Sequence, residues 1–246
     1  MIRYICVATD TRLYFPYLTQ LLPELVVLGM GMKWKGFIMK FNLLVEYLET
    51  LNDDDIICFI DAYDVLPTKN IVNLEKQFIE FSKENPEVKM IIGADEEIYY
   101  IQNIVHSLIF HCPNINSGTY IGYCKNILHI LNTILKRPNI YDDQMELGRY
   151  AKTHKNEIYI DKYSSFFRVG MIALRQFNLN GNTSCSFIHA NGNGHLEDFL
   201  LEHHSIVVNN HERNIIFRQN CDGLYKKIKL YISYSFNLMP RLWSDK

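Results

Sequence analysis

The chain has 246 residues, of which 48% are hydrophobic and 21% are charged, and its formal net charge is -2. This balance is typical of a globular protein with a sizeable core and excludes the disordered and fibrous classes. Lysine and arginine are scattered along the chain. A nucleic-acid partner, which would need a concentrated basic face, is therefore not expected. No Pro-, Gly- or Ser-rich linker divides the chain, which favours one domain over two.

The first residues lead directly into an apolar run, Tyr4–Ala8, which predicts a first strand rather than a secretory signal peptide. No apolar run is long enough to predict a membrane span. The six cysteines are widely spaced and include no Cys-x-x-Cys pair. We interpret them as buried free thiols in a reducing compartment, and we therefore expect a cytoplasmic protein.

Strand-like and helix-like patterns alternate through the first two-thirds of the chain, which is typical of βαβ units that build a mostly parallel sheet. Short apolar runs predict the strands, and apolar residues at three- and four-residue spacing predict the helices. In chain order, the strands are expected at 4–8, 25–28, 56–60, 88–94 and 186–188, and the helices at 37–51, 71–81, 127–135 and 142–154. The predicted fold class is α/β, with a mostly parallel sheet flanked by helices.

The last fifty residues are rich in Tyr, Phe and His and show no clean period before 224–236. We interpret them as an extension packed on the same domain. The aromatic run Leu230–Phe236 favours packing within its own domain. The alternative is a subunit or membrane-surface contact, and a subunit contact would make the protein a homodimer.

The continuous apolar strand Ile56–Ile60 stops at Asp61, and Asp64 follows three residues later. In open α/β sheets, ligands gather at the carboxyl ends of the strands. Two carboxylates on one turn can bind Mg²⁺ or Mn²⁺, which would bridge the diphosphate of a nucleotide sugar and neutralise the departing nucleoside diphosphate. Capping of the turn by the two aspartates is an equally good interpretation. Tyr63, between them, is either a stacking platform for a base or a core aromatic residue.

Three further segments carry polar residues suited to a ligand. His189 opens the segment His189-Ala190-Asn191-Gly192-Asn193-Gly194, whose glycines allow close approach of the backbone to a ligand. A single histidine is more often a packing residue than a metal ligand, so both interpretations stay open. Asn116-Ser117-Gly118 could bind sugar hydroxyls, although a tight turn is favoured by these residues alone. Asp142-Asp143-Gln144 is either the N-terminal cap of a helix or a second sugar-binding segment.

Taken in order, these segments resemble the glycosyltransferase domain of the procollagen lysyl hydroxylase/glycosyltransferase family, which glucosylates galactosyl-hydroxylysine in collagen. The resemblance covers residues 1–195 and leaves residues 196–246 as the extension. The matching segments are Val7-Ala8-Thr9, Leu28-Gly29, Trp34-Lys35-Gly36, Lys40, Phe59-Ile60-Asp61-Ala62-Tyr63-Asp64-Val65, Ala94-Asp95, Asn116-Ser117-Gly118-Thr119-Tyr120-Ile121-Gly122, Asp142-Asp143-Gln144 and His189-Ala190-Asn191-Gly192-Asn193-Gly194. Because these segments occur in the family's order, coincidence is improbable.

The resemblance implies a fold, a donor and a metal. The fold would be of the GT-A type, the donor UDP-glucose, and the metal Mn²⁺, with Mg²⁺ as a substitute. By matching position, Asp61, Asp64 and His189 would be the metal ligands. Transfer in the family retains the anomeric configuration and needs no obvious general base, so we assign none.

The resemblance also implies roles for residues around the donor. Tyr63 and Thr9 would face the uridine, and Lys40 would approach the diphosphate. The remaining positions would be Asn191, Gly192 and Gly194 near the nucleotide, and Asn116, Asp142 and Asp143 at the donor sugar as the catalytic residues.

The chain departs from the family in two ways. The glycine-rich segment between Trp34-Lys35-Gly36 and Lys40 is shorter, and we expect neither the family's hydroxylase domain nor its signal peptide. We therefore expect a stand-alone enzyme like those of large DNA viruses that encode collagen-like proteins. It would act on a collagen-like polypeptide in the cytoplasm of the producing or host cell, or with the virion. Two alternatives are galactose transfer from UDP-galactose to hydroxylysine, and a collagen-binding module without turnover.

Overall fold

The computed structural model describes residues 1–94, 113–170, 184–191 and 196–219. Its centre is a six-stranded sheet in the order β2-β1-β3-β6-β5-β7, and only β6 in this sheet runs antiparallel to its neighbours. The strands are β1 (Ile2–Val7), β2 (Val26–Leu28), β3 (Ile56–Ile60), β5 (Met90–Gly93), β6 (Asn116–Tyr123) and β7 (Ile158–Asp161). The predicted α/β class with a mostly parallel sheet is confirmed. The sequence patterns did not predict β6 or β7.

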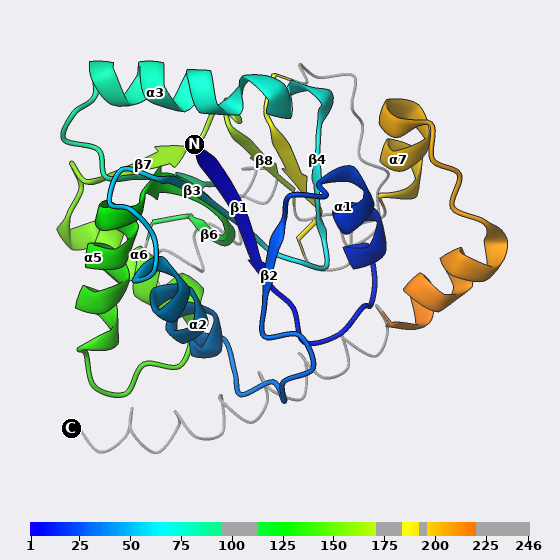
Figure 1. The fold of residues 1–246 in the computed structure, drawn as a ribbon, viewed down its shortest axis with the longest axis horizontal. Helices are drawn as coiled ribbons and strands as arrows, with labels where there is room; N and C mark the ends of the chain where they lie inside the picture. The colour runs from blue at the N-terminus through cyan, green and yellow to red at the C-terminus, as the bar shows by residue number, and fades with distance from the viewer. Residues whose placement is uncertain (95–112, 171–183, 192–195, 220–246) are drawn as a thin grey trace, which may run out of the picture.

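Helices cover both faces of this sheet (Figure 1). They are α1 (Phe15–Leu21), α2 (Ile38–Leu48), α3 (Leu74–Glu84), α5 (Cys124–Leu135), α6 (Asp143–Thr153) and α7 (Glu197–His204), and the 3-10 helix η1 (Lys69–Asn73) precedes α3. The four predicted helices are confirmed as α2, α3, α5 and α6. The shorter α1 and α7 contain about two turns each, which is too few to show a hydrophobic period. No described helix combines the length and apolar character needed to cross a membrane.

Successive residues of β1 and β3 supply two separate cores, because neighbouring side chains of a strand point to opposite faces. Cys6 and Cys58 belong to the core that packs against α1, α3 and α7. Ile5 and Phe59 belong to the core that packs against α2, α5 and α6. A strand covered on both faces carries apolar residues at every position, and this explains the uninterrupted run Ile56–Ile60.

A second, three-stranded sheet contains the strand predicted at 186–188, and its other two strands were not predicted. It consists of β4 (Val65–Pro67), β9 (Phe187–His189) and β8 (Phe167–Val169), in that order. The buried carboxylate of Asp161, at the end of β7, supports the turn into β8. Its Oδ2 accepts hydrogen bonds from the backbone N–H groups of Phe166 (2.7 Å) and Phe167 (2.9 Å). In β4 and β9, Val65 lies opposite His189.

The described part of the C-terminal extension packs on the same core as the central sheet. Leu196, Phe199 and Leu200 belong to the core beneath α1 and α3, as do Val208 and Ile216. In the described residues, the segments before and after the predicted boundary at residue 195 therefore share one core. The aromatic run predicted to pack or to form a dimer contact, 230–236, lies outside the described residues.

The expected buried free thiols are confirmed at four of the six cysteines. Cys6, Cys58, Cys124 and Cys185 are free and buried. Burial raises the pKa of the Cys185 thiol to about 11, so this thiol remains protonated at neutral pH. Positions 112 and 221 lie outside the described residues.

His204 should make stability depend on pH. Its Nε2 lies 2.8 Å from the carbonyl oxygen of Pro67, and burial lowers the pKa of His204 below 6.5. As the pH falls, the unfolded chain therefore binds a proton at His204 before the folded chain does. The contribution of neutral His204 to the free energy of unfolding is complete above pH 6.5 and is lost as the pH falls through the lowered pKa. In His204→Gln, we expect the free energy of unfolding to fall less steeply between about pH 6.5 and 5.

Urea titrations at several pH values would measure this slope. His129→Gln provides the matched control, because His129 is exposed on α5 and the same substitution is made there. Equal slopes for wild type and His204→Gln would contradict the assignment.

Candidate active site

The end of β3 positions the first predicted metal ligand. The backbone N–H of Asp61 donates a 2.7 Å hydrogen bond to the carbonyl of Gly118, so Asp61 continues the ladder between β3 and β6. The turn Asp61-Ala62-Tyr63-Asp64 then leads out of the large sheet and into β4. Both aspartates are therefore delivered at the carboxyl end of a central strand, where ligands of α/β proteins gather.

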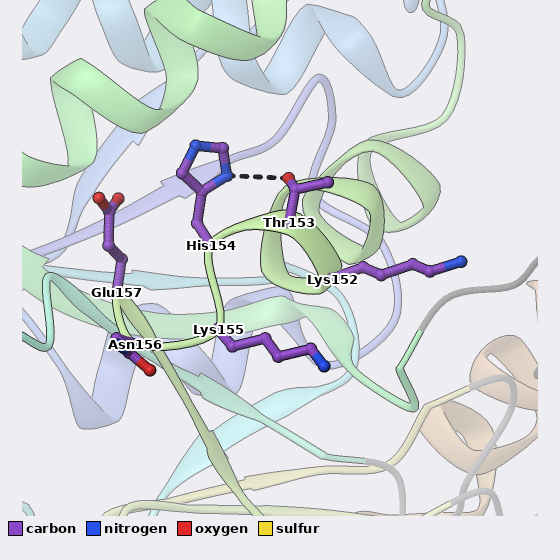
Figure 2. A pocket seen from close by; sticks show the side chains of 6 residues that line it. All are labelled: Lys152, Thr153, His154, Lys155, Asn156 and Glu157. Atoms are coloured by element: carbon purple, nitrogen blue, oxygen red, sulfur yellow. Dashed lines mark hydrogen bonds between the residues drawn. The ribbon is translucent and has the colours of Figure 1, made fainter.

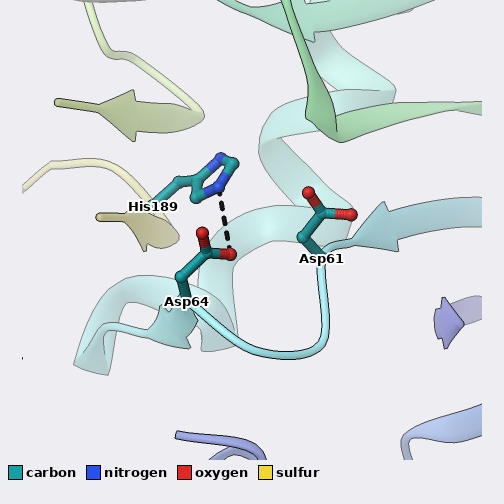
Figure 3. Close-up of side chains that lie close together, drawn as sticks. All are labelled: Asp61, Asp64 and His189. Carbon is teal, nitrogen blue, oxygen red and sulfur yellow. Dashed lines mark ion pairs between the residues drawn. The ribbon is translucent and has the colours of Figure 1, made fainter. Parts of the chain in front are cut away.

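The small sheet brings His189 to these aspartates. The pairing of β4 with β9 sets Val65 opposite His189, and the N–H of Ala190 donates to the carbonyl of Asp64 at 2.8 Å. His189 Nε2 then lies 3.2 Å from Asp64 Oδ1 (Figure 3). One ligand atom each from Asp61, Asp64 and His189 lies within 4.8 Å of the others. His189 is buried, whereas both aspartates are partly exposed, so a cation could enter from the solvent side.

Gly118 provides the space in which these groups converge. A Cβ atom built on Gly118 would lie 2.4 Å from His189 Cε1 and 2.6 Å from Asp61 Oδ2, closer than atoms approach without a clash. Glycine leaves this space open because it has no side chain. Two carboxylates favour Mg²⁺ or Mn²⁺, and an imidazole nitrogen favours a transition metal. The donor set therefore fits a divalent cation, with Mn²⁺ the better match to both ligand types.

Tyr63 is held beside Thr9 at the end of β1. The Tyr63 hydroxyl accepts hydrogen bonds from the backbone N–H groups of Thr9 (2.9 Å) and Asp10 (3.3 Å). The Arg12 guanidinium lies 4.4 Å from the centroid of the Tyr63 ring, a cation–π contact, and Phe15 packs nearby at 6.4 Å. The two residues predicted to face uridine are thus neighbours. Arg12 was not predicted, because the segment before α1 shows no recognisable sequence pattern.

Lys40 is enclosed by protein groups. Its Nζ lies 2.9 Å from Asp61 Oδ1 and 2.7 Å from Asp143 Oδ2, and both Lys40 and Asp143 are buried. Burial alone lowers the pKa of Lys40, but the carboxylates of Asp143 and Asp61 outweigh it and raise the pKa above its usual value. Lys40 is therefore charged. Its predicted contact with a diphosphate stays a prediction.

The residues predicted at the donor sugar lie on β6 and at the start of α6. Asn116-Ser117-Gly118 is the buried beginning of β6, so the alternative of a tight turn is wrong. The Asn116 Oδ1 accepts from the N–H of Gly118 at 2.9 Å. Asp142 caps α6 by accepting from the N–H of Met145 at 2.8 Å, and burial raises the pKa of its carboxyl group. Capping thus explains Asp142 without excluding a sugar contact.

Asn191 is the last described residue beside this site. It follows Ala190, whose N–H is bonded to Asp64, and it is partly exposed. Gly192 and Gly194, predicted to approach the nucleotide, lie outside the described residues.

A separate pocket lies where α6 ends and β7 begins (Figure 2). Its lining residues are Lys152, Thr153, His154, Lys155, Asn156 and Glu157. The Tyr150 hydroxyl donates to Glu157 at 2.6 Å, and Lys89 pairs with the same carboxylate at 2.9 Å. None of the predicted site residues lines this pocket, and its acidic group already has two partners. We interpret these contacts as support for the β5–β7 edge of the sheet.

Comparison with known proteins decides the family. Residues 5–210 match the family model described as the PLOD GT domain. The chain belongs to this glycosyltransferase family. The match confirms the resemblance stated above and, together with the observed sheet, the GT-A-type α/β fold. The chain therefore carries a glycosyltransferase domain of this family.

Individual relatives of this PLOD GT chain are distant. An uncharacterized protein of Acanthamoeba polyphaga mimivirus is 23% identical, and the match covers 72% of this chain and 43% of that protein. A Caenorhabditis elegans protein named multifunctional procollagen lysine hydroxylase and glycosyltransferase is 26% identical, and the match covers 72% of this chain and 23% of that protein. The chain thus spans less than half the length of either relative.

A solved structure of the galactosyltransferase LgtC, in complex with donor and acceptor sugar analogs, is 14% identical. The match covers 87% of this chain and 99% of that one, with a TM-score of 0.49. This likeness is too low to carry an argument about the site.

The space at Gly118 can be tested by filling it. In Gly118→Ala, the new methyl group would displace His189 or Asp61, and we expect the affinity for Mn²⁺ to fall by about tenfold or more, as when metal ligands lose their orientation. Isothermal calorimetry without nucleotide would measure it. Ser117→Ala, at the adjacent strand position, is the control and should bind Mn²⁺ like wild type. Undiminished Mn²⁺ affinity in a folded Gly118→Ala variant would show that the three side chains are not the ligands.

Proposed function

We propose that this protein transfers glucose from UDP-glucose to galactosyl-hydroxylysine of collagen-like chains and uses Mn²⁺ held by Asp61, Asp64 and His189. The observation that carries the proposal is the convergence of these three side chains at the carboxyl end of β3. Membership in the PLOD GT family supports the choice of donor and acceptor.

The metal ligands and the nucleotide-binding residues have separate tasks. A bound divalent cation would stabilise the negative charge that develops on the departing UDP. Asp61 and Asp64 would hold it where the turn faces solvent. Tyr63 offers an aromatic surface for uracil, and its bonds to the Thr9 and Asp10 amides fix that ring before the donor arrives. The nucleotide would thus bind to groups that are already in place.

The sugar would lie toward the start of α6. Carboxylates there can accept hydrogen bonds from sugar hydroxyls, and both Asp142 and Asp143 belong to the first turn or its cap. Asn116, bonded to Gly118 beneath the metal ligands, is placed to support the same region. Asp142, which is partly exposed, would contact the sugar, and the buried Asp143 and Asn116 would support that contact from within the protein. No residue is assigned as a general base.

Donor and acceptor can be tested together. With purified protein and Mn²⁺, we expect UDP release to be faster from UDP-glucose than from UDP-galactose, and a galactosyl-hydroxylysine peptide to accelerate it. Preference for UDP-galactose and a hydroxylysine peptide would instead indicate galactose transfer. Donor binding without UDP release from either sugar would indicate a collagen-binding module.

The catalytic role of the metal site can be tested by replacing its ligand Asp64 with asparagine, which is neutral and has a similar shape. In Asp64→Asn, we expect metal-dependent UDP release to fall by about a hundredfold or more, because charge stabilisation by the cation contributes several kcal/mol to such transfers. Asp54→Asn is the matched control, since Asp54 is 84% exposed and precedes β3 at its opposite end. Unchanged Mn²⁺-dependent release in a folded Asp64→Asn variant would overturn the proposal.

A further inference from the structure

Lys40 joins three elements that are separate in the sequence. It lies in the first turn of α2, Asp61 follows β3, and Asp143 is the first residue of α6. The two carboxylates meet at one ammonium group, at 2.9 Å and 2.7 Å. A metal-site residue and a sugar-site residue are thereby connected through a single side chain.

The two oxygens of Asp61 face different partners. Its Oδ1 is paired with Lys40. Its Oδ2 lies on the side of Gly118 and His189, because a Cβ built on Gly118 would be 2.6 Å from this oxygen and 2.4 Å from His189 Cε1. Lys40 therefore binds one oxygen of the Asp61 carboxylate, and the other oxygen points toward His189. Partners of this kind orient metal ligands in many proteins.

The surroundings of Lys40 leave little access for a phosphate. Lys40 is 7% exposed, and the rings of Phe37 and Phe59 each lie 5.9 Å from its Nζ. An ammonium group has three donors, and two are directed at carboxylates. Moving it onto a diphosphate would leave Asp143, which is 3% exposed, buried without its cation. Breaking a buried pair in this way is strongly unfavourable.

We propose that Lys40 is a positioning residue, which fixes Asp61 for the metal and ties it to Asp143, rather than a ligand of the diphosphate. The inference rests on the proposed metal site at Asp61, Asp64 and His189. Its consequence is that a change at Asp143, which is not one of the proposed ligands, alters metal binding in the absence of any nucleotide.

Two single variants test this consequence. Asp143→Asn and Asp142→Asn remove the same charge from adjacent positions, but only Asp143 pairs with Lys40. Asparagine at position 142 retains the helix cap, because Asn and Asp cap equally well. Without its second partner, Lys40 would pair more strongly with Asp61 and compete with the cation. We expect Asp143→Asn to weaken Mn²⁺ binding by about 10- to 100-fold and Asp142→Asn by about threefold or less, measured by calorimetry without nucleotide.

Repeating the Asp143→Asn substitution in a Lys40→Met variant shows whether its effect on Mn²⁺ affinity depends on Lys40 or only on the loss of a negative charge. If the effect passes through Lys40, Lys40→Met and Lys40→Met/Asp143→Asn should bind Mn²⁺ with affinities within about twofold of each other. A persistent Asp143→Asn effect in this background would overturn the proposal. The double variant also removes the unpaired buried carboxylate that Lys40→Met leaves behind. If Lys40→Met does not fold, the comparison of Asp143→Asn with Asp142→Asn decides alone, and equal affinities would refute the inference.

A nucleotide titration gives the second readout. At saturating Mn²⁺, a positioning role predicts that the Lys40→Met/Asp143→Asn and Asp143→Asn variants bind UDP with affinities within about twofold of each other, because Lys40 would then not contact the nucleotide. A large loss of UDP affinity with unchanged affinity for uridine would instead identify Lys40 as a diphosphate ligand. Failure of the wild type to bind Mn²⁺ would contradict the proposed metal site itself, so the two failures are distinguishable.

Discussion

The pairing of β4 with β9 is the interaction on which the site depends. It consists of three residue pairs, and it continues into the bond between the Ala190 amide and the Asp64 carbonyl. This short ladder carries His189 to the turn that follows β3. Because the large sheet fixes Asp61 and the small sheet fixes His189, the two sheets must fold together before the three side chains can meet.

Charge balance stabilises this arrangement of carboxylates. Asp61, Asp64 and Asp143 bring three carboxylates into one region, and Lys40 pairs with two of them. The buried ammonium prevents the unfavourable burial of Asp143 as an isolated charge. Asp64 instead faces His189 at the solvent side of the turn. One positive charge is thus built into the protein, and the remaining negative charge favours a divalent ion.

The sequence by itself determined the α/β class, most of the central strands and the four longer helices. These follow from local patterns, because a buried strand must be apolar throughout and an amphipathic helix must repeat every three to four residues. The strand-to-aspartate junction at Asp61 was equally visible, as was the cap at Asp142. For the metal, however, the residues Asp61 and Asp64 alone left ligand binding and turn formation equally good, and only the ordered resemblance separated them.

Tertiary structure decided the contacts between distant residues. Only β9 of the small sheet was predicted, because β4 and β8 have three residues each and are too short to show alternation. No sequence spacing could place Lys40 between Asp61 and Asp143, since their separation in space is set by how α2 and α6 pack on the sheet. Likewise, the need for glycine at 118 arises only from His189 and Asp61 approaching the same point. Local physics specifies elements, whereas a site made from several elements exists only once their packing is complete.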